Sequence, residues 1–315
     1  MINSPLIWIV IGLIVVLGIL SIKTEIPHEY TTTIYTPVTT LPSVGYEIHE
    51  WGVLVGCRES DEGFLTSRPE QMLLVRQPVI YVHSSGVNEF DLEVTFNIGK
   101  PTDTYPEAYV DENKIKWENV GISKIATTRG VKGFIPLEEI IPILRDVDAD
   151  YLVFGDTTDR FLFYEGELTF DNRINVNYDL ETMKATFVNN GDYTAHDVMF
   201  VYSKGEDFLH PKIYMAKVGE LTPNQAVVVN LDEFTPDAKI LETNLIELGF
   251  TKKEANSFAN LWYTTMFIPS NYEGYANLIY RLPEDEYDDM ISVKFNPEPQ
   301  KIIRALYVLI DVLEE

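Results

Sequence analysis

The stretch FDLEVTFNIG (residues 90–99) alternates Phe, Leu, Val and Phe with Asp, Glu, Thr and Asn. Because successive side chains of a strand point to opposite faces of a sheet, this alternation predicts a strand with one face buried and the other in water. Half-buried strands of this kind are typical of antiparallel sheets. The stretch therefore predicts a mainly antiparallel β protein.

Similar β signals flank this stretch on both sides. The segment PLEEIIPILRDV (136–147) is mixed and has room for one short helical turn. YLVF (151–154) and FLFYEGEL (161–168) are separated by the polar turn GDTTDR, which predicts a hairpin with a longer loop. Together these segments predict a β-rich domain over 46–166, with further strands at YEIHEWGVLVG (46–56), PVIYVHSS (78–85) and KIKWENVGI (114–122).

The next region, 167–234, consists of short β segments with regular turns. INVNYDLETMKATFVNNGDYTAHDVMFVYS (174–203) predicts two strands around the turn cluster Asn189–Asp192. IYMAKVGELTPNQAVVVNL (213–231) predicts a strand, a Leu-Thr-Pro-Asn turn and another strand. This pattern favours an immunoglobulin-like β-sandwich.

The C-terminal region, 235–315, mixes helical and β patterns. Apolar residues recur at helical spacing in AKILETNLIELGF (238–250), with Gly249 as the residue that ends the helix. Thr251 and Glu254 form the T-x-x-E pattern of a capping box before a second helix. Because three β segments follow (YANLIYRLP, ISVKFNP and KIIRALYVLIDVL), we expect a small α+β part here.

An apolar run, Leu6–Ile22, precedes all of these segments and contains no charge or proline. As a helix it would extend about 25 Å, near the lower limit for crossing the hydrocarbon layer of a membrane. No basic residue precedes the run and no A-x-A cleavage pattern follows it, so an uncleaved anchor is favoured over a signal peptide. We expect a single-pass transmembrane anchor at 1–22, a Thr/Pro-rich linker at 23–45, and the bulk of the chain outside the cytoplasm.

Two resemblances follow from ordered motifs. The Asn189–Gly191 turn and the Leu221–Pro223 turn make 167–234 resemble the CARDB-type immunoglobulin-like modules of prokaryotic surface proteins. That resemblance implies a role in spacing, presentation or binding.

A second set of motifs, in matching order, covers most of 46–315: His49–Gly52, Pro78–Tyr81, Phe161–Gly166, Pro297, Pro299 and Arg304. Through these motifs the chain resembles an exported bacterial family of conserved hypothetical proteins that begin with a His-Glu-Trp-Gly strand. Glu165 stands where that family has Arg, so no role of that arginine carries over. This resemblance implies export and an envelope location but no known reaction.

The net charge and the cysteine content limit the classes of molecule that the protein is expected to bind. The formal net charge is −25, from 49 acidic and 24 basic residues. This charge repels nucleic acid and anionic headgroups, so no nucleic acid partner is expected. Cys57 is the single cysteine, which excludes an intramolecular disulfide and favours a prokaryotic cell surface.

Candidate metal ligands are few. The sequence has no H-E-x-x-H or Cys-x-x-Cys spacing. His49, Glu50 and His83 lie on two expected strands that can be neighbours, and a His/Glu/His metal site is possible there. The alternative is that these are partly buried residues with ordinary hydrogen bonds. Cys57 with His49 or His83 could form a nucleophilic pair, but a lone cysteine is more often a small apolar residue.

Asp146, Asp148 and Asp150 begin like the D-x-D-x-D part of a calcium loop. Tyr151 and Thr157, however, stand where an EF-hand needs Gly and Glu. A solvated strand edge is favoured, with calcium as the alternative, and no cofactor is otherwise expected.

The sequence as a whole predicts a mainly β protein. Antiparallel β-sandwich domains, one immunoglobulin-like, are followed by a small α+β part behind an N-terminal transmembrane helix. The expected function is that of a membrane-anchored extracytoplasmic cell-surface protein with a structural or binding role and a possible protein partner. The alternatives are a metal-dependent envelope hydrolase using His49, Glu50 and His83, and an accessory subunit of a membrane complex. No catalytic centre is expected under the first reading, because no nucleophile elbow or phosphate-binding glycine loop occurs.

Overall fold

The computed structural model describes residues 44–56, 71–126, 140–204, 210–269 and 274–312. Leu6–Ile22, nearly all of the linker and Cys57 lie outside these ranges. None of the helices within them combines the length and the apolar character that a membrane span requires. The anchor at 1–22 therefore stays a prediction.

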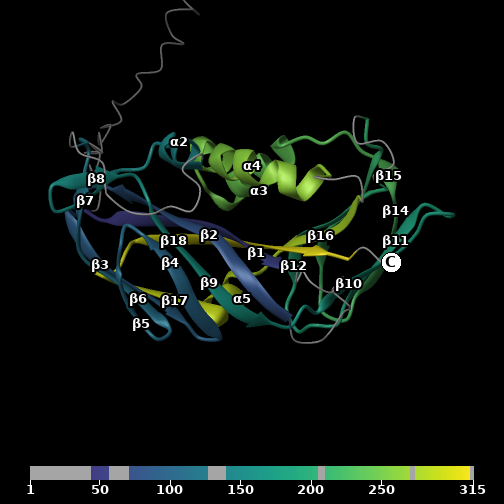
Figure 1. The fold of residues 1–315 in the computed structure, drawn as a ribbon, viewed down its shortest axis with the longest axis horizontal. Coiled ribbons are helices and arrows are strands. Elements are labelled where there is room, and N and C mark those ends of the chain that lie inside the picture. Colours follow the sequence, from purple (N-terminus) through teal and green to yellow (C-terminus); the bar gives the residue numbers. More distant parts are fainter. Residues whose placement is uncertain (1–43, 57–70, 127–139, 205–209, 270–273, 313–315) are drawn as a thin grey trace, which may run out of the picture. The chain divides into compact units, whose positions relative to one another are not determined.

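A nine-stranded sheet forms the centre of the fold (Figure 1). Its order is β15-β13-β12-β16-β18-β1-β2-β9-β4, so the first and the last described strands lie side by side in its middle. β1 and β18 pair in parallel, and the other neighbours pair antiparallel. The strands are β1 (Tyr46–Gly56), β2 (Gln71–Ser84), β4 (Gly99–Tyr105), β9 (Leu162–Phe170), β12 (Ala195–Ser203), β13 (Ile213–Leu221), β15 (Asp232–Glu233), β16 (Tyr275–Arg281) and β18 (Lys301–Asp311).

Two smaller sheets pack against one face of this sheet and share a core with it. The first has the order β17-β3-β6-β7-β8, with β5 paired to β6, and the second has the order β10-β11-β14. The strand predicted from residues 90–99 is β3, and its core face is buried as the alternation requires. These strands are β3 (Glu89–Phe96), β5 (Tyr109–Asp111), β6 (Lys114–Ser123), β7 (Tyr151–Phe154), β8 (Thr157–Asp159), β10 (Ile174–Asp179), β11 (Lys184–Asn189), β14 (Ala226–Asn230) and β17 (Ile291–Asn296).

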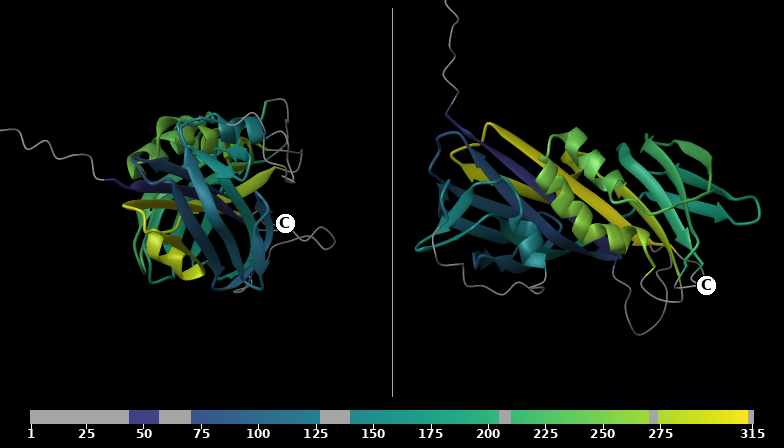
Figure 2. Two further views of the ribbon diagram at one scale, coloured as in Figure 1. Left: turned by 90° about the vertical axis from the view of Figure 1, so that its left-hand side faces the viewer. Right: turned by 90° about the horizontal axis from the view of Figure 1, so that it is seen from above.

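The helices α2, α3 and α4 cover the opposite face, whereas α5 lies on the side of the smaller sheets (Figures 1 and 2). α3 (Lys239–Leu248) ends at Gly249, whose φ of 109° places it in the left-handed region that glycine adopts without strain. α4 (Lys252–Phe267) begins at the predicted capping box, which is confirmed. α2 (Ile141–Arg145) is the short helical turn expected near that position, and α5 (Glu284–Met290) precedes β17.

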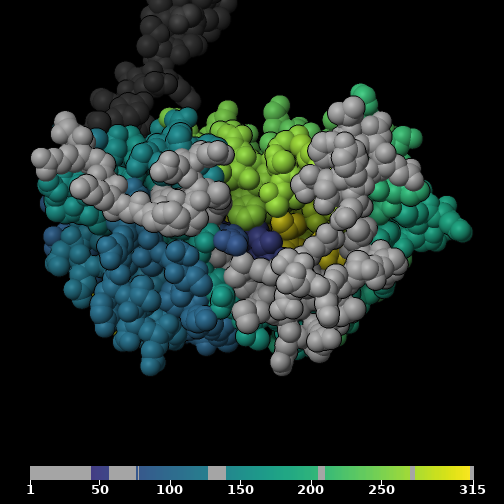
Figure 3. All heavy atoms as spheres, viewed as in Figure 1, coloured from purple at the N-terminus to yellow at the C-terminus, as the bar shows by residue number. Residues whose placement is uncertain are grey.

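β1 is covered on both of its faces. Ile48 and Leu54 face the smaller sheets, whereas Trp51 and Val53 face the helices. The Trp51 ring is fully buried and packs edge-on against Phe258 of α4, with the two ring centroids 5.3 Å apart. On the face seen in Figure 3, β1 (purple) shows only as a small patch near the centre.

The mainly β prediction is confirmed, but the predicted hairpin of 151–154 with 161–168 is wrong. β7 pairs with β8, which occupies half of the expected turn, while β9 lies between β2 and β4 in the large sheet. The reason is that β9 buries side chains on both faces. A strand of that kind belongs in the interior of a covered sheet and not in an exposed hairpin.

Residues 174–234 do form two packed layers, but they share a sheet with the rest of the chain. β10, β11 and β14 form one layer, which packs through Tyr178 on Phe200 and Tyr202 of β12. β12 also pairs with β16, so the nine-stranded sheet continues across the expected boundary at 234/235. The two turn motifs meet, since the buried Asn189 side chain donates to the Leu221 carbonyl at 2.8 Å.

Candidate metal centre

Two histidines lie together on the helix-covered face of the large sheet. β1 and β2 pair antiparallel with Glu47 opposite His83 and His49 opposite Tyr81. His49 and His83 are thus diagonal neighbours on the same face, within reach of each other. Their ring centroids are 4.6 Å apart.

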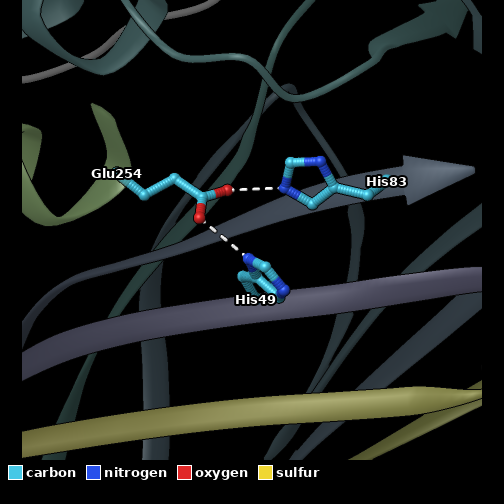
Figure 4. Close-up of side chains that lie close together, drawn as sticks. All are labelled: His49, His83 and Glu254. Atoms are coloured by element: carbon cyan, nitrogen blue, oxygen red, sulfur yellow. Dashed lines mark hydrogen bonds and ion pairs between the residues drawn. The ribbon is translucent and has the colours of Figure 1, made fainter. Parts of the chain in front are cut away.

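Glu254 of α4 reaches down to both rings (Figure 4). Its Oε2 contacts His49 Nδ1 at 2.8 Å, and its Oε1 contacts His83 Nε2 at 2.7 Å. Oε2 also accepts from the Thr251 backbone N–H at 2.8 Å, which is one half of the capping box. The helix start therefore fixes the carboxylate in the position where the histidines meet it.

The cluster is buried around an ionised carboxylate. Glu254 has no exposed surface, and His49 is only 4% exposed, while the His83 side chain is 24% exposed. Burial by itself raises the pKa of Glu254. The hydrogen bonds and charges of His49 and His83 outweigh burial and lower this pKa to about 2. The carboxylate consequently carries its negative charge throughout the physiological pH range.

The three side chains have the chemistry of metal ligands. Each offers one donor atom, and these atoms lie within 4.8 Å of one another. In the part of the chain that the structure describes, no other trio of His, Cys, Asp or Glu shows this convergence. Imidazole nitrogen with a carboxylate oxygen is a donor set used for zinc and other divalent transition metals.

Glu50 is not part of this cluster, although the sequence placed it beside His49 and His83. It points to the opposite face of the sheet, where its Oε2 accepts from Arg304 Nε at 2.7 Å. Its Oε1 accepts from the hydroxyls of Tyr164 at 2.5 Å and Tyr287 at 2.6 Å. The physical reason is the two-residue period of a strand, which sends adjacent side chains to opposite faces.

The three aspartates are divided between two lysines. Asp146 and Asp148 lie 3.1 and 3.3 Å from Lys253 Nζ. Asp150 accepts from the backbone N–H of Ser84 at 2.7 Å and pairs with Lys124. The triplet thus does not gather around one point, as a calcium loop would. Cys57, the candidate nucleophile, lies outside the described residues.

Sequence reasoning missed Glu254 as the partner of the histidines. The capping box identified this residue as a helix cap, and the structure shows that the same carboxylate also contacts the two rings. A separation of 205 residues from His49 hides this contact from any local pattern.

Two open grooves lie away from the cluster. One has a volume of about 500 Å³ and is bordered by β13, β14 and β15. The other, of about 480 Å³, lies beside β5 and β6. Neither groove is lined by His49, His83 or Glu254.

No family model and no curated protein matches the chain. Among solved structures it is similar to the yeast delta-COP-I mu-homology domain complexed with a Dsl1 WxWxV peptide. The TM-score is 0.31 and the identity 9%, covering 86% of this chain and 98% of that chain. The yeast delta-COP-I mu-homology domain without a named ligand gives a TM-score of 0.33 and 8% identity, with the same coverage of 86% and 98%.

Proposed function

We propose that this chain is a membrane-anchored, extracytoplasmic cell-surface protein that binds an extended segment of another protein. The observation that carries the proposal is that β13 and β14, although consecutive in the chain, belong to different sheets. A short turn joins these strands, yet β13 belongs to the nine-stranded sheet and β14 to the three-stranded sheet. Because the two strands do not pair with each other, one edge of each strand lies beside the groove bordered by β13, β14 and β15.

Both strand edges have backbone N–H and C=O groups that pair with no other described strand. Within the described residues, β14 has a ladder partner only in β11. β13 pairs with β12 along its length but with β15 only at Tyr214 and Met215. Unpaired strand edges present rows of N–H and C=O groups that can accept a further strand. An extended peptide is the ligand that matches such an edge.

The groove between the edges adds apolar contacts and charge. Val228 of β14 is 59% exposed, so its side chain offers apolar surface beside the groove. An added strand could bury Val228 and place alternate side chains into the groove. The lining residues are Met215, Lys217, Val228, Val229, Asn230, Asp232, Glu233 and Phe234.

The location follows from the sequence features. The apolar run Leu6–Ile22 and the Thr/Pro-rich linker suit an anchor with a stalk, and the net charge of −25 suits an aqueous surface. The hydrolase alternative loses support because Glu254 is fully buried and its cluster lines neither groove. An accessory subunit would be a binding protein of the same kind.

The binding proposal is tested by Val228→Asp in the full-length protein extracted with detergent. Val110 of β5 is 48% exposed and lies beside the other groove, so Val110→Asp is the matched control. We expect Val228→Asp to abolish co-purification of a partner that the wild type and Val110→Asp both retain. Equal retention by all three proteins, or equal loss in both variants, would contradict a role for the β14 edge.

The location is tested separately. Full-length protein should resist carbonate extraction from membranes, and protease added to intact cells should cut within 23–45 and release a stable fragment. A mature protein that begins near residue 23 and is soluble would refute the anchor.

A further inference from the structure

We propose that His49, His83 and Glu254 bind one divalent metal ion of the zinc class at the junction of β1, β2 and α4. The ion would hold the start of α4 against the sheet. This inference goes beyond the partner binding proposed above, and it stands or falls independently of it, because the groove beside β14 shares no residue with the cluster.

The present distances between the histidine nitrogens and the Glu254 oxygens are close to those that separate the ligand atoms of a bound zinc ion. Zinc binds imidazole nitrogen and carboxylate oxygen at about 2.0–2.2 Å, so tetrahedral ligand atoms lie about 3.4 Å apart. The two nitrogen–oxygen contacts are now 2.8 and 2.7 Å. Small rotations of the side chains would therefore open the space that the ion needs.

Coordination also requires a proton to move within each ring. His49 Nδ1 and His83 Nε2 now contact carboxylate oxygens, which accept hydrogen bonds from them. To bind the ion, each of these nitrogens needs its lone pair, so each neutral ring carries its proton on the other nitrogen. A neutral ring keeps its number of protons in this step, whereas a ring protonated on both nitrogens releases one proton to water as the ion binds.

The second nitrogen of His49 supplies an independent observation. His49 Nε2 is buried and has no hydrogen-bond partner among the described residues. Glu47 Oε2 lies 3.9 Å away on a side chain that is 46% exposed. Metal-bound histidines usually donate their other N–H to a carboxylate or carbonyl. With the proton on Nε2, a small movement of the half-exposed Glu47 side chain would bring its carboxylate from 3.9 Å to hydrogen-bond distance, so coordination would give this orphaned atom a partner.

Glu254 is arranged as an oriented anionic ligand. The Thr251 N–H donates to its Oε2 and fixes the orientation of the carboxylate at the start of α4. Outer hydrogen bonds of this kind orient ligands and raise metal affinity. His83 is the most exposed of the three residues and provides the route of entry. Calcium and magnesium, which prefer oxygen donors only, should not bind here.

The test uses full-length protein in detergent, stripped with a chelator and then dialysed with zinc. Retained zinc is measured by mass spectrometry, and affinity by titration against a competing chelator. His83→Gln keeps an N–H donor at similar reach, and Glu254→Gln keeps the capping acceptor. His196→Gln is the control, because His196 of β12 pairs with Glu220 at 3.3 Å, away from the cluster.

Wild type and His196→Gln should retain one zinc ion per chain. His83→Gln and Glu254→Gln should bind zinc more weakly by more than the 10- to 100-fold that loss of an outer-shell partner typically causes. Glu47→Gln should fall within about that 10- to 100-fold range. Wild type without stoichiometric zinc would overturn the proposal, and so would cluster variants that bind zinc as tightly as wild type.

Because a variant can fail to fold, the wild type provides a second readout. Cobalt(II) added to the stripped wild type should give the absorption of a low-symmetry nitrogen- and oxygen-ligated ion, and zinc should displace it. The spectrum of free aqueous cobalt would overturn the proposal. Millimolar calcium should displace no cobalt, and displacement by calcium would likewise contradict a nitrogen-containing site.

Discussion

Two adjacent residues of β1, His49 and Glu50, lie in two different polar clusters on opposite faces of the same sheet. On the face toward the smaller sheets, Glu50 pairs with Arg304, and both are almost fully buried. On the face toward the helices, His49 shares the Glu254 carboxylate with His83. Each cluster ties β1 to a distant part of the chain.

The clusters differ in how fully their polar atoms are paired. Both oxygens of Glu50 accept hydrogen bonds, from Arg304, Tyr164 and Tyr287. Burial raises the pKa of both tyrosines well above the usual value, so their hydroxyls stay protonated and donate. Arg304 also stacks over the Tyr287 ring, with its Cζ 3.7 Å from the centroid.

The histidine cluster, in contrast, leaves His49 Nε2 without a hydrogen-bond partner among the described residues. A fully paired buried network serves stability, whereas an unpaired buried atom calls for an explanation such as an unseen ion. The comparison thus separates a structural cluster from a candidate ligand site, although both are charged and buried.

The largest expected effect is that of Glu50→Ala. Removal of the carboxylate leaves the buried Arg304 charge without its main partner, and breaking one side of a buried ion pair typically costs about 3–5 kcal/mol. Chemical denaturation of the purified full-length protein measures the loss. A loss below about 1 kcal/mol would show that water or another carboxylate replaces Glu50, and the structural reading of this cluster would fail.

A double replacement, Glu50→Leu with Arg304→Met, should cost clearly less than Glu50→Ala alone. No unpaired buried charge then remains, because Asp288, the other partner of Arg304, is half exposed to water. Buried ion pairs replaced by apolar residues are often close to neutral. The double-mutant cycle with the single variants gives the coupling energy. Additive losses would mean that the two side chains act independently.

The next largest effect is expected from acid, which should destabilise the histidine cluster by protonating Glu254. Its pKa in the folded protein, about 2, lies below the usual value of 4.5, so its ionised form stabilises the folded state at pH values above 4.5. This stabilisation should disappear as the pH falls from 4.5 toward 2. Unfolding free energies measured over that range should fall more steeply for wild type than for Glu254→Gln. If the unfolding free energies of wild type and Glu254→Gln changed with pH in the same way, the stabilising interaction of Glu254 with the histidines would be contradicted.

The smallest effect is expected at the surface. Asp148 is 65% exposed and shares Lys253 with Asp146, so Asp148→Asn should leave the melting temperature unchanged within error. Millimolar calcium should act equally on wild type and variant. A calcium-dependent rise of the wild-type melting temperature that Asp148→Asn removes would revive the calcium loop.

Local patterns predicted much of the fold. The alternation in 90–99 gave β3, and the T-x-x-E pattern gave the start of α4 at Thr251. Both rest on interactions within a few residues, which a sequence displays directly. The wrong hairpin at 151–168 shows the limit, because a strand buried on both faces does not reveal which strands flank it.

The candidate site was half predictable. His49 and His83 lie on strands whose register follows from alternation and pairing, and the sequence brought them together. The exclusion of Glu50 was also accessible, since a residue next to His49 in a strand must face the other way. The contact of Glu254 with the two histidines could not be predicted from the sequence, because it depends on how α4 packs over the sheet.

The parallel pairing of β1 with β18 has a consequence for the order of folding. Residues 47–55 pair with 301–309, so the central ladder joins the first described strand to the last. Contacts so distant in sequence are slow to form, because a long loop must close before they stabilise the chain. During synthesis, β1 has no partner on that side until residues 301–309 have emerged. Under the proposed anchoring, the membrane would hold β1 near its surface, and the sheet would be completed only after nearly the whole chain has crossed.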